Sequence, residues 1–140
     1  INASGLTAQR YRMDVIAQNV ANANTTRTED GTPYKRKVVT FEEKNGGTPQ
    51  FSTIFGRTTE RYRSKGVKVS GTYDDTSEGN MVYDPSHPDA DENGYVTYPN
   101  VNIVTEMTNL IDASRSYEAN ATAFEASKSI AGQGLQLGNP

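Results

Sequence analysis

Small and apolar residues recur at alternating spacings of three and four over the last third of the chain, from Ile103 to Leu135. A repeat of seven residues over two helical turns keeps one stripe of side chains on one helix face. The pattern therefore predicts a helix roughly 50 Å long, capped at its start by Asn100 or Asn102. Its stripe includes Met107, Leu110, Tyr117 and Phe124.

The beginning of the chain follows the same spacing rule, which predicts a second helix within residues 1–26. The stripe of this helix consists of Leu6, Met13, Ile16 and Val20. Two such stripes are buried when the helices pair with each other. We therefore expect the two long terminal helices to form an antiparallel coiled-coil hairpin, with the two stripes as its intrachain seam.

Each helix also carries a second row of small or apolar residues that one partner helix cannot cover. On the first helix, Tyr11 and Val15 lie off the main stripe, with Ala8 beside them. On the last helix, the row consists of Ala119, Ala123, Ala126 and Ile130. A helix that is apolar around most of its circumference is normally buried on several sides. We expect these rows to contact other subunits; the alternative is that the middle of the chain folds back over them.

The middle of the chain is expected to form short strands separated by turns, so the predicted fold class is α+β with a small, irregular, β-rich middle segment. Alternating β-branched and aromatic residues between Gly, Pro and Asn predict these strands. They are Tyr34–Phe41, Gln50–Phe55, Gly66–Tyr73, Asn80–Tyr83 and Tyr95–Tyr98. The chain is thereby divided into a helix at 1–26, a middle segment at 27–99 and a helix at 100–140.

Composition argues against a large self-contained core and against thiol chemistry. The chain has 140 residues, of which 34% are hydrophobic, and it has no cysteine. This content lies below the usual globular level, and without cysteine there is no disulfide or thiolate ligand. No apolar run approaches the roughly 18 residues of a membrane span, and no cleavable signal peptide is recognisable. Because the chain begins with Ile1 instead of Met, we expect its natural start, with any export signal, to be missing.

Charge is segregated along the middle of the chain, although the formal net charge is only −3. Residues 34–68 hold nine basic and three acidic residues, whereas residues 73–92 hold seven acidic residues and no Lys or Arg. Opposite blocks can pair within a chain or steer copies into register. The basic block is also a candidate nucleic-acid surface, but the acidic block would repel phosphate. We therefore expect no nucleic-acid partner.

Two local patterns could carry chemistry. Residues 89–94 match the first half of an EF-hand calcium loop, but the twelfth position is Asn100 instead of the bidentate Glu. The alternative is a polar turn in which Asp and Asn bind their own backbone and Gly94 adopts a positive φ. His87 is the single histidine and has no accompanying nucleophile motif. We expect no catalytic residue, no metal ion and no cofactor.

Both ends of the chain resemble the flagellar rod and hook proteins, a family of axial proteins. At the N-terminal end the resemblance lies in residues 4–10 (SGLTAQR), 13–16 and 19–26 (NVANANTT). At the other end it lies in residues 106–107, 114–120 and Phe124. Residues 30–37 and 83–96 are similar to the proximal-rod members of the family. The resemblance covers nearly the whole chain except about 45–75.

The resemblance implies a structural subunit of the rod in the bacterial flagellar basal body, which crosses the periplasm. In the family, the terminal helices build the inner part of a helical tube that transmits torque, and the middle segment contacts neighbours outside it. The implied partners are copies of the chain, other rod proteins and the flagellar type III export apparatus, with no small-molecule substrate. The remaining alternatives are another axial rod or hook subunit, a calcium-dependent binding module and a hydrolase that uses His87.

Overall fold

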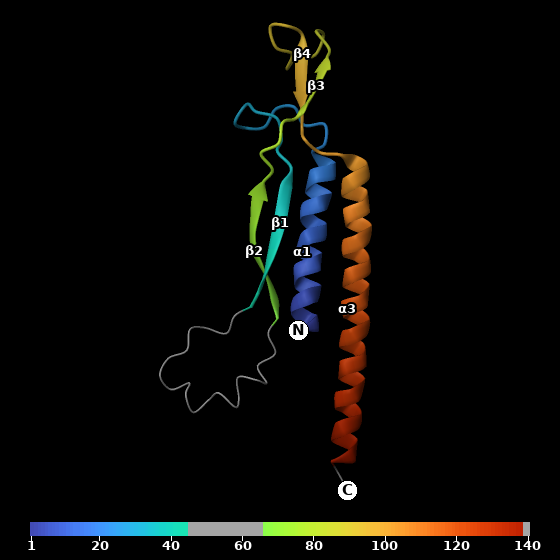
Figure 1. Ribbon diagram of the computed structural model, residues 1–140. Helices are drawn as coiled ribbons and strands as arrows, with labels where there is room; N and C mark the ends of the chain where they lie inside the picture. Colours follow the sequence, from blue (N-terminus) through green and yellow to red (C-terminus); the bar gives the residue numbers. More distant parts are fainter. Residues whose placement is uncertain (45–65, 139–140) are drawn as a thin grey trace, which may run out of the picture.

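The computed structural model describes residues 1–44 and 66–138. Within these ranges the chain forms a stem of two helices with two small antiparallel sheets beside and above it (Figure 1). The elements are α1 (Asn2–Ala21), β1 (Lys37–Glu43), β2 (Val67–Asp74), β3 (Asn80–Tyr83), β4 (Tyr95–Tyr98) and α3 (Ile103–Leu137). This combination confirms the expected α+β class. The expected strand Gln50–Phe55 lies outside the described residues.

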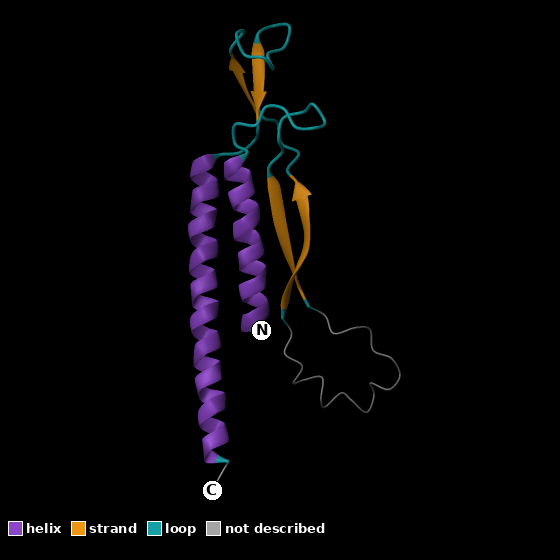
Figure 2. Cartoon of the chain, turned by 180° about the vertical axis from the view of Figure 1, so that it is seen from behind, coloured by secondary structure: helices purple, strands orange, loops and turns teal. Residues whose placement is uncertain are grey.

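The two helices lie side by side and run in opposite directions (Figures 1 and 2). α1 has 20 residues and α3 has 35, so α3 continues beyond the start of α1, and residues 122–138 are exposed. Neither of these helices is long and apolar enough to cross a membrane. Asn102 caps α3 by accepting a hydrogen bond from the backbone N–H of Thr105 at 3.2 Å.

α1 ends at Ala21, earlier than the expected boundary at residue 26. The reason is local hydrogen bonding by the residues that follow the helix. The Asn22 amide donates to the carbonyl of Gln18, and the Thr25 hydroxyl donates to the Asn22 side chain. Short polar side chains that bind nearby backbone in this way compete with helix continuation.

The lower sheet, which we define as β1 and β2, packs along α1. Its register runs from Lys37 opposite Asp74 to Glu43 opposite Val67. Under it, Ala8 and Val15 of α1 are each 4% exposed. Val15, which we expected at a subunit interface, is therefore enclosed by its own chain. At Ala8 and Val15 the middle segment folds back over α1, whereas Tyr11 of the same row is 42% exposed.

The upper sheet, which we define as β3 and β4, stands above the stem (Figure 1). The turn between its strands is the polar turn that the sequence offered as the alternative to a calcium loop. Asp91 Oδ1 accepts hydrogen bonds from the backbone N–H groups of Asn93 and Tyr95, both at 2.9 Å, and Gly94 has a φ of +83°. Within this sheet Val96 of β4, which lies opposite Val82 of β3, is fully buried.

Candidate functional site

The stem and both sheets meet at one cluster of polar side chains, which we call the polar junction. It consists of Asn19 from α1, Arg36 just before β1, Asp75 just after β2, Asn100 just before α3, and Glu106 in the first turns of α3. Figure 1 shows these elements converging at the upper end of the helices. Each member is held by a different segment of the chain, so the junction joins all parts of the fold.

Asn19 binds the start of β1 in the way that a neighbouring strand would. Its side chain is almost fully buried, at 1% exposure. The Asn19 amide donates to the carbonyl of Lys37 and accepts from the N–H of the same residue, both at 2.9 Å. The Tyr34 hydroxyl donates to the same Asn19 oxygen at 3.0 Å. Because a buried amide is costly unless it is hydrogen-bonded, these contacts fix β1 on α1.

Glu106 is the most deeply buried charged residue among those described, at 0% exposure. Its carboxylate accepts a hydrogen bond from the Arg36 guanidinium Nε, and a weaker one from the Asn19 amide at 3.4 Å. The hydrogen bond with Glu106 is the main reason that the pKa of Arg36 is raised. A buried carboxylate of this kind is stable only because a cation and a donor pair with it.

Arg36 also reaches the acidic end of β2. Its Nη1 lies 3.4 Å from Asp75 Oδ2, so one arginine bridges a buried and a half-exposed carboxylate. The pKa of Asp75 is lowered, first by hydrogen bonds from the hydroxyl and N–H of Ser77 and then by Arg36. This ion pair joins the basic and acidic blocks of the sequence within one chain, which is one of the two outcomes expected from their opposite charges.

Asn100 completes the junction on the side of the upper sheet. Its Oδ1 accepts from the N–H of Arg36 at 2.9 Å, and its Nδ2 donates to the carbonyls of Asp75 and Ser77, both at 3.1 Å. Asn100 was a candidate helix cap in the sequence; the structure places it two residues before the cap and uses it to connect the lower sheet to α3. Tyr34 contacts the junction through its hydrogen bond to Asn19, and burial, with the charges of Asp74 and Glu106, raises the pKa of its hydroxyl.

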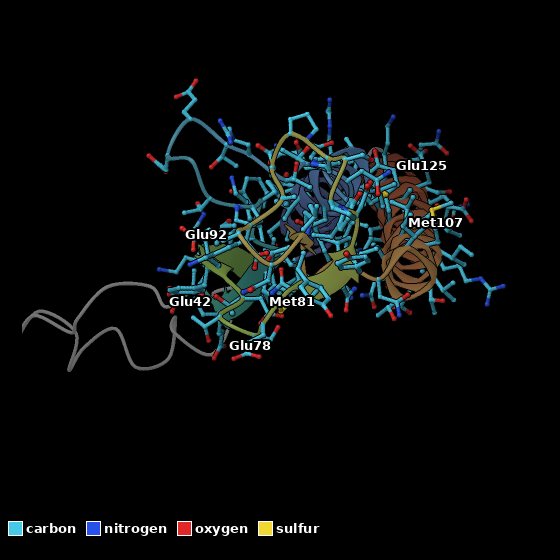
Figure 3. All side chains as sticks on the ribbon, turned by 90° about the horizontal axis from the view of Figure 1, so that it is seen from above. Glu42, Glu78, Met81, Glu92, Met107 and Glu125 are labelled. Carbon is cyan, nitrogen blue, oxygen red and sulfur yellow. The ribbon has the colours of Figure 1, made fainter. Side chains whose placement is uncertain are left out.

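The residues of the expected seam differ in how far they are buried. Ile16 is buried, and the partly buried members are Leu6, Met13, Val20, Leu110 and Tyr117. Met107 and Phe124 are 47% and 42% exposed. Seen from above, Met107 and Glu125 project from α3 at the edge of the molecule (Figure 3). α3 instead buries Glu106, one position before Met107 of the expected stripe, and Ala113.

The expected small-residue row of α3 is exposed throughout. Ala119, Ala123, Ala126 and Ile130 are all open to solvent, and so is part of the Tyr11 ring on α1. The Tyr11 hydroxyl lies 2.9 Å from the hydroxyl of Thr72 on β2. Of the six residues expected at subunit interfaces, Val15 is therefore the one that its own chain covers.

Asp89, a candidate calcium ligand, and His87, a candidate catalytic residue, both make contacts that hold the turn of the upper sheet in place. Asp89 receives a hydrogen bond from Thr26 at 2.7 Å and an ion pair from Arg27 at 2.6 Å. His87 Nδ1 accepts from the backbone N–H of Asp89 at 3.0 Å, and its ring packs edge-on against Tyr98. Across the two described ranges, no three His, Asp or Glu side chains are grouped to hold a metal ion.

The polar junction was not predicted from the sequence, because apolar periodicity selects only apolar residues for buried positions. Glu106 and Asn19 are polar residues at buried positions, which a hydrophobic pattern cannot select. The available signal was indirect: both residues fall in the segments that carry the family resemblance, 19–26 and 106–107.

Comparison with known proteins identifies both ends of the chain. Residues 1–27 match the family model described as flagella basal body rod protein. Residues 92–137 match the model described as the C-terminal part of the flagellar basal body rod FlgEFG proteins. These matches contain Asn19 and the two C-terminal members of the junction.

Three relatives that match nearly the whole chain have the same name. The flagellar basal-body rod protein FlgC of Bacillus subtilis is 43% identical, over 99% of this chain and 94% of its own length. FlgC of Borreliella burgdorferi is 42% identical, over 93% of this chain and 88% of its own. FlgC of Salmonella typhimurium is 40% identical, over 99% of this chain and 93% of its own length. The chain therefore belongs to the family of FlgC flagellar basal-body rod proteins, structural subunits of the rod in the flagellar basal body.

Proposed function

We propose that this rod subunit assembles through its terminal helices into a helical tube, and that the polar junction makes each subunit stiff enough to transmit torque. The observation that carries the proposal is the fully buried Glu106, paired with Arg36 at the point where stem and sheets meet. Breaking a buried pair by removing one partner costs about 3–5 kcal/mol. That cost arises because the remaining charge stays buried without a partner, so the pair holds Arg36, just before β1, in one position against α3.

In this proposal the two helices pair as an antiparallel coiled coil. The stem consists of residues 1–26 and 100–140, and the middle segment, 27–99, contacts neighbours outside the tube. The seam runs along Leu6, Met13, Ile16 and Val20 of α1 and along Leu110 and Tyr117 of α3, with Met107 and Phe124 at its margins. Partial or complete burial of the six central residues supports this arrangement.

Other subunits would pack on Tyr11, Ala119, Ala123, Ala126 and Ile130. Their exposure in the isolated chain supports the assignment, because small residues let a second helix approach closely. The partners are copies of the chain and other rod components, and the export apparatus that delivers it. The role is structural, with no catalysis and no cofactor, in line with the names of the relatives.

Complementation of a strain that lacks this subunit tests both parts of the proposal. We expect Glu106→Ala to reduce motility strongly, while Glu125→Ala, an exposed control on the same helix, leaves it normal. We expect Ala123→Asp to block rod assembly without unfolding the purified chain, because its side chain is exposed. Normal rods and motility with both Glu106→Ala and Ala123→Asp would refute the proposal.

A further inference from the structure

Three contacts between α1 and α3 are spaced one heptad apart along α1, at positions 5, 12 and 19. We call them the register contacts, and they are Gly5 with Asn120, Arg12 with Asp112, and Asn19 with Glu106. The middle contact is an ion pair with Nη1 and Oδ2 3.5 Å apart, and the third is a hydrogen bond between Nδ2 and Oε2 at 3.4 Å. Along α3 the partners follow in reverse order, as two antiparallel helices require.

Each register contact fits its own pair of side chains. A Cβ at Gly5 would lie 2.9 Å from the Asn120 side-chain oxygen, so a larger residue there would have to displace that asparagine. Asn120 is held in place because its amide donates to the carbonyl of Ser116 at 2.9 Å. Next to Asp112, the small residue Ala113 is fully buried. The three contacts therefore differ in size and charge, and none can replace another.

The apolar stripes, in contrast, do not define which heptad of α1 faces which heptad of α3. Leu6, Met13 and Val20 repeat every seven residues, and the stripe of α3 repeats in the same way at 110, 117 and 124. A slide of α1 by seven residues, about 10 Å, would bring similar side chains face to face again. A polar residue at a seam position selects one register of such helices at a cost in stability. Gln9 shows that cost, because its side-chain oxygen is buried without a hydrogen-bond partner among the described residues.

A slide of one heptad would break all three register contacts. In one direction Asn19 would lie beyond the start of α3 at Ile103, and in the other Glu106 would lie beyond the end of α1 at Ala21. Asn19 also binds both main-chain groups of Lys37, so the lower sheet would have to move with α1. The residue before Lys37 is the arginine that pairs with Glu106, and the slide would separate that buried pair as well.

We infer that the register contacts, and not the apolar stripes, set the register of α1 on α3; this inference rests on the coiled-coil pairing in the proposed function. The register decides how far α3 continues past the start of α1 (Figure 1). It thereby positions the exposed row of α3 that contains Ala123 relative to α1 and the lower sheet. A subunit in a slipped register would present that row about 10 Å out of place.

Double electron–electron resonance on the full chain measures this register. Spin labels are attached through Ala17→Cys on α1 and Lys128→Cys on α3, two exposed positions in a chain that has no cysteine of its own. With the register contacts intact, we expect a single distance between the labels. We expect a second distance, displaced by about 10 Å, when apolar residues replace the polar ones. The substitutions are Arg12→Met, Asn19→Leu, Arg36→Met and Glu106→Leu.

The matched control weakens the apolar stripes and leaves the register contacts in place. It carries Met13→Ala and Leu110→Ala, and we expect a lower midpoint of thermal unfolding with one unchanged label distance. A displaced distance in this control would overturn the inference, because the stripes would then set the register. A single, unchanged distance in the folded apolar variant would overturn it too.

Circular dichroism shows whether each variant keeps its helices. Where the fourfold variant does not fold, the milder pair Arg12→Met and Asn19→Leu decides in the same way, since it keeps the buried pair of Arg36 and Glu106. The label distance is read on the purified chain, so an unchanged distance overturns this inference alone. The motility and rod-assembly tests in cells decide the proposed function.

Discussion

The side-chain amide of Asn19 on α1 pairs with both main-chain groups of Lys37, donating to its carbonyl and accepting from its N–H at 2.9 Å each. A helix side chain thereby takes the place of a strand at the first residue of β1. This contact orients the lower sheet on the stem, and through the weaker bond to Glu106 it reaches α3.

We predict that Asn19→Ala lowers the free energy of unfolding by about 2–3 kcal/mol, because buried donors and acceptors on Lys37 and Tyr34 lose their partner. Urea denaturation of the purified chain measures the change. Asn22→Ala is the control, since Asn22 bonds locally at the end of α1, and we expect it to cost about 1 kcal/mol or less. Equal effects of the two substitutions would show that the Asn19 contacts do not stabilise the fold.

A double-mutant cycle on Arg36 and Glu106 should show strong coupling. We expect Glu106→Leu alone to cost about 3–5 kcal/mol, because Arg36 keeps its charge beside an apolar site. Adding Arg36→Met should recover most of the loss, since apolar replacement of a buried pair is often neutral. The free energies of unfolding of the four proteins provide the test. Additive losses in the double variant would contradict a buried pair.

Replacing glycine with alanine should destabilise the fold at Gly79, where a side chain has no room, and be tolerated at Gly132, where it has. A Cβ at Gly79 would lie 2.1 Å from the carbonyl oxygen of Tyr98, so Gly79→Ala must displace β3 from β4. A Cβ at Gly132 meets no described atom within 4 Å, and Gly132→Ala should stabilise α3 by up to about 1 kcal/mol. Thermal unfolding and amide hydrogen exchange of β4 check both results. A harmless Gly79→Ala would mean that β3 and β4 do not pair in this register.

At low pH, protonation of Asp89 should weaken its contacts with Thr26 and Arg27. The pKa of Asp89 is lowered from 3.8, first by the hydrogen bond from the Thr26 hydroxyl and further by the Arg27 and His87 charges. A carboxyl with a lowered pKa stabilises the fold above its unfolded pKa, and that contribution is lost as the pH falls through the folded pKa. Because the folded pKa of Asp89 lies below 3.8, we expect the Thr26 and Arg27 contacts to open only as the pH falls below that ordinary value.

An NMR titration of Asp89 and Thr26 follows this opening. Asp89→Asn should remove the acid-dependent part of the Thr26 signal, whereas Asp91→Asn, in the same turn, should leave it in place. A Thr26 signal that stays constant down to pH 2 in the unmodified chain would contradict the contact.

The alternation of residues around Tyr95–Tyr98 and Asn80–Tyr83 predicted both strands of the upper sheet with the bounds that the structure has. Prediction was less exact for the strand expected at Tyr34–Phe41, which begins instead at Lys37. There Tyr34 and Arg36 have contacts with Asn19, Asn100 and Glu106, and those partners are distant in sequence. Local propensity cannot detect such contacts, so it misplaces the boundary.

The sequence by itself determined the two terminal helices, the strands of the upper sheet and the family, because each depends on local spacing or on a local motif. Only the tertiary structure decided that the lower sheet covers Val15 and that Glu106 faces the interior. Burial of a carboxylate depends on whether an arginine 70 residues away in the chain lies beside it, and hydrophobic periodicity carries no information about that pairing.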